Sequence, residues 1–153
     1  MRAAARTIAA MLAASAASGA AAMPSAQEIF CADLARVLET ARIGGDFIDL
    51  ERSRAAPPAL GFARGCRAAG DTRRHYWVCH QQFAPESMGV EALAGRVAAC
   101  LPEAVRAKPG MYREAVFTLP YARIRVSEHG GPGGHVGRIA ELLVEATGPR
   151  AQD

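Results

Sequence analysis

Four cysteines constrain the fold of this 153-residue chain more than any other feature, and they stand at Cys31, Cys66, Cys79 and Cys100. An even number of cysteines in an exported protein predicts two disulfide bonds. Loop-closure entropy does not select the pairing, because two of the three alternatives give the same summed stabilisation of about 7 kcal/mol. The spacing does not fit a zinc site, because no C-x₂₋₄-C pair is present.

A predicted β-hairpin does select the pairing. The segment 62–82 folds back on itself, and the turn places Cys66 directly opposite Cys79. Directly opposed residues on antiparallel strands bring their Cβ atoms close enough for a disulfide. The sequence therefore favours the Cys66–Cys79 bond and a second bond between the two remaining cysteines, Cys31 and Cys100.

The first 22 residues have the composition of a secretory signal peptide. Arg2 and Arg6 form a positive region, and an alanine-rich apolar segment without acidic residues follows them. We expect cleavage after Ala22, or as late as Ala26. The segment is too short for a stable membrane span, which needs about 20 strongly apolar residues. These features predict an exported bacterial protein, periplasmic or extracellular, without stable membrane insertion.

The chain that follows the signal has the length of one domain. Residues 23–148 are expected to form a small disulfide-bonded domain, and 149–153 a disordered tail. Removing the signal leaves 16 basic and 15 acidic residues, which is a net charge of +1. A charge this close to zero gives no reason to expect nucleic acid or a membrane surface as a partner.

Hydrophobic periodicity predicts two helices and about five strands. The helices cover 29–42, where Ser25 and Glu28 have capping-box spacing, and 88–101, which Ser87 would cap. The strands cover 62–69, 74–82, 114–119, 121–129 and 136–146, and the segments 51–61 and 103–113 are loops. The segment 136–146 also fits a helix, but the glycine-rich turn before it favours a strand that completes a hairpin.

This order of elements predicts an α+β fold, in which two helices pack on an antiparallel sheet of about five strands. The segment 60-LGFAR-64 is echoed by 119-LPYAR-123, and each follows a predicted helix at the same interval. The echo suggests that the domain consists of two tandem helix–hairpin units.

The sequence contains none of the common catalytic or cofactor motifs. It has no G-x-S-x-G, H-E-x-x-H or C-x-x-C motif and no P-loop, and four bridged cysteines leave no thiol nucleophile. The segment 128-EHGGPGGHVGR-138 is a poor phosphate cradle, because Pro132 removes one backbone amide. Its glycines instead fit a hairpin connection that needs positive φ angles. We therefore expect no enzyme activity and no cofactor.

The tip of the first hairpin, 73-RRHYW-77, is the best candidate for contact with another protein. Arginines and aromatic rings are enriched in recognition surfaces. The alternative interpretation is that alternation along the strand turns Trp77 into the core and leaves the arginines solvated. On the first interpretation the chain is a non-catalytic protein-binding or inhibitor-like module. Its contact residues would be Arg73, Arg74, His75, Tyr76 and Trp77.

A second hypothesis is a periplasmic metal-binding protein. His75, His129 and His135 could supply imidazole ligands for zinc or copper. The glycine-rich turn brings His129 and His135 near each other, and His75 has a near-equivalent position in the other hairpin. The hypothesis requires ring nitrogens close enough to share one ion through bonds of about 2.1 Å.

Overall fold

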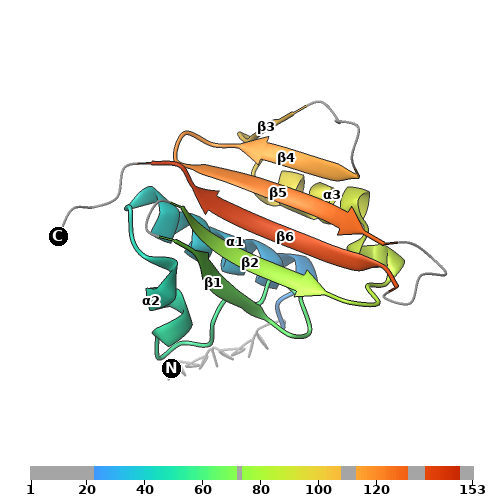
Figure 1. The fold of residues 1–153 in the computed structure, drawn as a ribbon, viewed down its shortest axis with the longest axis horizontal. Helices are drawn as coiled ribbons and strands as arrows, with labels where there is room; N and C mark the ends of the chain where they lie inside the picture. Colours follow the sequence, from blue (N-terminus) through green and yellow to red (C-terminus); the bar gives the residue numbers. More distant parts are fainter. Residues whose placement is uncertain (1–22, 72–73, 108–112, 131–136, 149–153) are drawn as a thin grey trace, which may run out of the picture.

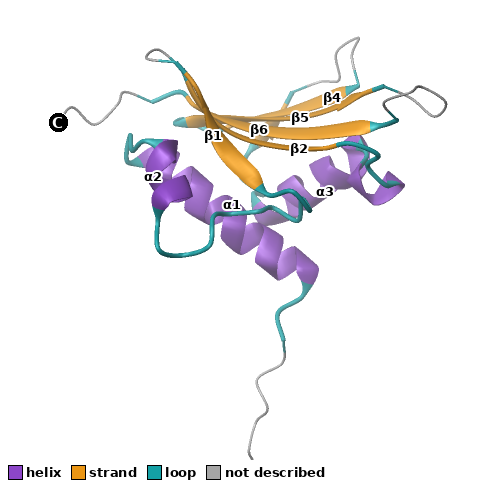
Figure 2. Ribbon diagram, turned by 60° about the horizontal axis from the view of Figure 1, so that its bottom comes forward, coloured by secondary structure: helices purple, strands orange, loops and turns teal. Residues whose placement is uncertain are grey.

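A computed structural model describes residues 23–71, 74–107, 113–130 and 137–148. The expected signal at 1–22 and the expected tail at 149–153 lie outside the described residues. The described chain forms a six-stranded antiparallel sheet with helices on one face (Figures 1 and 2). The α+β class is thus confirmed, and none of the described helices is long and apolar enough to cross a membrane.

The structure adds a short helix and a short strand to the predicted set. The elements in chain order are α1 (Ala26–Arg42), α2 (Phe47–Arg52), β1 (Cys66–Gly70), β2 (His75–Gln81), the 3₁₀ turn η1 (Glu86–Met88), α3 (Val90–Cys100), β3 (Val105–Arg106), β4 (Glu114–Thr118), β5 (Ala122–His129) and β6 (Ile139–Ala146). The strand order across the sheet is β1-β2-β6-β5-β4-β3.

Both predicted disulfides are confirmed. Cys66 lies opposite Cys79 in the register of β1 and β2, with 4.2 Å between the Cα atoms. Cys31 in α1 is bonded to Cys100 in α3, with 5.3 Å between the Cα atoms. The first bond links the two strands of a hairpin. The second joins two helices through cysteines that are 69 residues apart in the sequence.

Helix capping explains where the helices begin. Ser25 and Glu28 form the predicted capping box, so α1 starts at Ala26, three residues earlier than its periodicity suggested. The predicted cap of the second helix is wrong, because Ser87 lies within η1 and Gly89 is the N-cap of α3. The helix α2 was not predicted, since its six residues are too few to show periodicity. Its cap is Asp46, whose side chain accepts a hydrogen bond from the backbone N–H of Ile48 at 3.0 Å.

The last predicted strand is confirmed as β6. Its buried positions are Ala140, Leu142 and Val144, which alternate as a strand requires. The core lies between the sheet and the helices. Its largest fully buried side chains are Trp77, Phe30, Phe47, Phe117, Leu34, Leu60, Leu93, Ile124 and Leu142.

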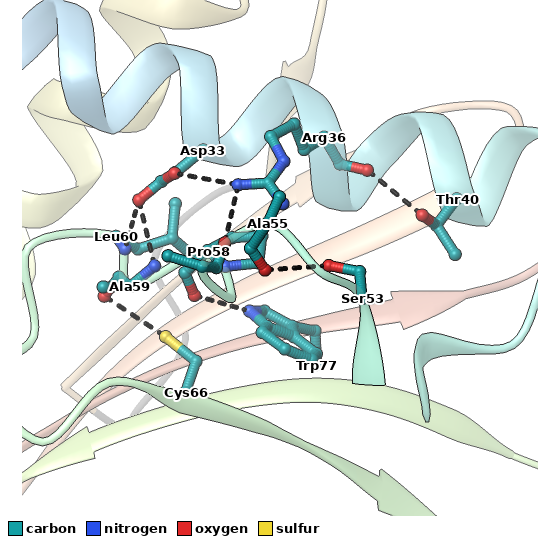
Figure 3. A network of polar contacts seen from close by, with 11 residues as sticks. Asp33, Arg36, Thr40, Ser53, Ala55, Pro58, Ala59, Leu60, Cys66 and Trp77 are labelled. Atoms are coloured by element: carbon teal, nitrogen blue, oxygen red, sulfur yellow. Dashed lines mark hydrogen bonds and ion pairs between the residues drawn. The ribbon is translucent and has the colours of Figure 1, made fainter. Parts of the chain in front are cut away.

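A network around Asp33 of α1 holds the loop between α2 and β1 over the core (Figure 3). One oxygen of the Asp33 carboxylate accepts hydrogen bonds from the backbone N–H groups of Ala59 and Leu60, at 2.9 and 3.1 Å. The neighbouring Pro58 carbonyl accepts a hydrogen bond from Trp77 Nε1 at 3.3 Å. The loop thereby satisfies the single polar atom of the fully buried Trp77 side chain.

The order of elements agrees with two helix–hairpin units. In the first half α1 precedes the hairpin β1–β2, and in the second half α3 precedes the hairpin β5–β6. The two hairpins meet inside the sheet through the antiparallel pair of β2 and β6. The halves are not equivalent, however, because α2, β3 and β4 have no counterpart in the opposite half.

Candidate functional site

The candidate site is the face of the sheet that the described helices leave open (Figure 2). Side chains alternate between the two faces along each strand, and Trp77, Ile124 and Leu142 lie on the buried face. Their sequence neighbours therefore lie on the open face. These neighbours are Tyr76, Val78 and His80 of β2, Glu141, Leu143 and Glu145 of β6, Arg123, Arg125, Ser127 and His129 of β5, and Glu114, Val116 and Thr118 of β4.

A hollow of about 740 Å³ lies on this open face. Three arginines and two glutamates line it, together with the ring of Tyr76 and the apolar side chains of Val116 and Leu143. The charged residues come from strands far apart in the sequence, and the sheet order brings them together. They are Arg74, Arg123, Arg125, Glu114 and Glu145.

The arginines of the hollow differ in their partners. A hydrogen bond with Tyr76 raises the pKa of Arg74, and the carboxylate of Glu145 acts in the same direction. Arg125 Nη2 lies 3.8 Å from an oxygen of Glu141. By contrast, the side chain of Arg123 makes no hydrogen bond or ion pair with any residue that the structure describes. Of the three arginines, Arg123 is therefore the one whose guanidinium group is not engaged by a described residue.

A polar cluster lies beside the hollow on β5. Ser127 Oγ is 3.3 Å from His129 Nε2 and 3.4 Å from Glu141 Oε1. In a hydrolase triad the acid binds the ring nitrogen that faces away from the serine. Here the carboxylate contacts the serine itself, and Ser127 is only 5% exposed. The geometry therefore gives no support for a serine nucleophile, and the cluster links β5 to β6.

The predicted contact residues are divided between the two faces of the sheet. Arg74 and Tyr76 line the hollow on the open face. The prediction that Trp77 is a contact residue is wrong, because its side chain is fully buried in the core and has no surface for a partner. His75 lies on the same face as Trp77, as the alternation of a strand requires. Arg73 lies outside the described residues.

The two predicted metal ligands that the structure describes, His75 and His129, do not lie close together. His75 lies on the helix side of the sheet, with Nδ1 3.9 Å from an oxygen of Asp46. His129 lies on the open face at the opposite end of the strands, about 20 Å away along β5. These two histidines cannot share an ion, which corrects that part of the metal hypothesis. His135 lies outside the described residues, within which no group of three potential ligands is close enough for a metal.

An ion-pair cluster joins the two ends of the segment 128–138. Glu128 Oε1 accepts a hydrogen bond from Arg113 Nη1 at 3.0 Å and lies 3.2 Å from Arg138 Nε. The Glu128 side chain is only 8% exposed. Gly130 and Gly137 have φ angles of +76° and +64°, which agrees with the predicted role of glycine in this turn. The ion pair of Glu128 and Arg138 could not be predicted from the sequence, because it depends on how the two ends of the segment meet in the folded chain.

Comparison with known proteins assigns no relative to this chain. No family model matches it, and neither does any curated protein or solved structure. The open face and its hollow are therefore the features that bear on function.

Proposed function

We propose that this chain is a non-catalytic, exported protein-binding module that docks its partner on the open face of the sheet. One observation carries the proposal, namely that half-buried apolar residues on this face are surrounded by charged ones. Val78 and Leu143 are cross-strand neighbours, and Val116 follows on the far side of Arg125. Arg67 flanks Val78 at the other end of this row. An apolar centre with a polar rim is the usual anatomy of a protein interface.

The edges of the sheet favour docking on the face over the addition of a strand. At one edge α2 lies against β1, where Glu51 accepts a hydrogen bond from the backbone N–H of Ala68 at 3.1 Å. At the other edge β3 is only two residues long. Covered or very short edge strands resist pairing with another chain. An inhibitor-like module that acts through its face fits this arrangement.

The proposed docking is tested by capturing partners from the exported protein fraction with the mature protein as bait. Replacing Leu143 with glutamate is expected to abolish specific capture, because it places a charge in the apolar centre of the face. Replacing Ile43 with glutamate is the matched control, since Ile43 is an exposed apolar residue at the end of α1. Thermal unfolding would verify that both variants are folded. Capture that survives Leu143→Glu but is lost with Ile43→Glu would contradict the proposal.

Export is supported by the two disulfides, since such bonds persist in oxidising compartments. We expect the N-terminal sequence of the mature protein to begin at Met23. Cleavage after Ala26 would remove Ser25, which caps α1, and also the Ala26 carbonyl that accepts a hydrogen bond from Arg96 at 3.2 Å. Edman sequencing of the protein from the periplasm or medium provides the measurement. An intact N-terminus on cytoplasmic protein would contradict export.

A further inference from the structure

The hollow on the open face carries an inference about the chemistry of the partner, which rests on the proposed docking. We propose that the partner is a protein that places one carboxylate side chain, from aspartate or glutamate, into the hollow. The carboxylate binds Arg123 and Arg125, and an apolar side chain next to it packs on Val116 and Leu143.

Arg123 is the primary anchor for the carboxylate. Its cross-strand neighbours in the register are Thr118 on β4 and Glu145 on β6. Its side chain has no hydrogen-bond or ion-pair partner among the described residues, so its donors are solvated. A guanidinium group binds a carboxylate through two parallel hydrogen bonds, which are stronger than neutral ones.

Arg125 is placed to assist. It lies two residues along β5 on the same face, about 7 Å away between Cα atoms. It is 45% exposed, and its contact with Glu141 at 3.8 Å is too long for a good hydrogen bond. Arg125 can therefore turn toward an entering carboxylate without losing a strong interaction.

The charge of the hollow selects a single carboxylate. Three arginines face two glutamates, Glu114 and Glu145, which leaves an excess of one positive charge. An incoming carboxylate would neutralise this excess. A phosphate group carries up to two negative charges, which would exceed this single positive charge and leave the hollow negative.

The apolar residues that line the hollow favour a ligand that has an apolar side chain next to its carboxylate. Val116 and Leu143 are the cross-strand partners of Arg125 on either side, so apolar surface flanks the guanidinium group. An acidic residue next to an aliphatic one in an extended segment presents both chemistries together. The proposed ligand is therefore a short acidic-aliphatic stretch of a partner protein.

The inference is tested by NMR with two blocked tripeptides, acetyl-Leu-Glu-Val-amide and acetyl-Leu-Gln-Val-amide. At about 10 mM, suited to the weak affinity of so small a ligand, the glutamate peptide should shift the backbone amides of Val116, Arg123, Arg125 and Leu143. The glutamine peptide should shift them at least fivefold less. Arg123→Glu should abolish the shifts, and Arg64→Glu, an exposed arginine in the loop before β1, should preserve them.

Equal shifts with both peptides, or no shifts with either, would overturn the carboxylate inference. Equal shifts with inorganic phosphate would overturn it as well. Concentration-dependent dimerisation that Arg123→Glu abolishes would show that the occupant is a second copy of this chain, again overturning it.

Capture of the partner separates this inference from the proposed function. Arg123→Glu is expected to weaken capture at least tenfold, whereas Arg64→Glu changes it less than twofold. If Leu143→Glu abolishes capture while Arg123→Glu leaves it unchanged, the docking face stands and the carboxylate inference fails. If neither variant changes capture, both fail.

Discussion

Replacing Trp77 with alanine is expected to lower the free energy of unfolding by about 3–5 kcal/mol. The indole is fully buried and packs near the ring of Phe47, with 6.5 Å between the ring centroids. Its removal leaves a large cavity under the loop that Asp33 holds in place (Figure 3). Small domains are stable by only about 5–15 kcal/mol, so this variant should lose much of its stability. Urea unfolding followed by circular dichroism measures the effect.

Replacing Trp77 with phenylalanine is the matched control. It keeps most of the apolar volume but removes the N–H that donates to the Pro58 carbonyl. The expected cost is about 1–3 kcal/mol, from the unsatisfied carbonyl and the smaller ring. If the alanine variant lost less than about 1 kcal/mol of unfolding free energy, Trp77 would not be a major source of core stability. Because Trp77 is buried, we expect both variants to affect partner binding only through stability.

Removing the Cys31–Cys100 disulfide is the second change with a large expected effect. Replacing both cysteines with alanine should lower the free energy of unfolding by about 4 kcal/mol, because the bond closes a loop with a sequence separation of 69 residues. The bond also joins α1 of the first half to α3 of the second. Denaturant unfolding of the double variant, compared with the oxidised parent protein, gives the measurement.

Gln27→Ala separates loop closure from local contacts around this disulfide. The Gln27 amide nitrogen lies 3.3 Å from Cys31 Sγ and 3.2 Å from Cys100 Sγ, and it donates to the Arg96 carbonyl at 3.1 Å. Its loss should cost only about 1 kcal/mol, because the covalent bond is kept. If the double cysteine variant lost no more stability than Gln27→Ala, the cross-link would not be the stabilising feature.

The hairpin and its disulfide could be predicted because they depend on local geometry. Residues alternate with period two along a strand, so the position of one turn decides that Cys66 faces Cys79. The same alternation places Tyr76 and Trp77 on opposite faces. Elements that are too short to show such a period were not predicted. The helix α2 has six residues and β3 has two, too few to show a period.

The candidate site could be predicted only in part. Alternation along a strand is enough to place Arg123 and Arg125 on one face and Ile124 on the other, whereas the nearness of the two arginines to Tyr76 cannot be inferred from it. That nearness depends on β6 lying between β2 and β5, which joins residues about fifty positions apart in the chain. The histidines show the converse, because the metal hypothesis placed His75 and His129 in one site, whereas the sheet keeps these two residues apart.

By itself, the amino-acid sequence determined which residues share a strand face, which cysteines pair and how α1 is capped. Each follows from chain neighbours within a turn or hairpin, where backbone geometry leaves few alternatives. Only the tertiary structure decided that the helices cover one face of the sheet and leave the other open. That choice follows from burying the apolar stripes of the helices and strands together, a long-range packing requirement. The hollow and the unpaired Arg123 exist because of it.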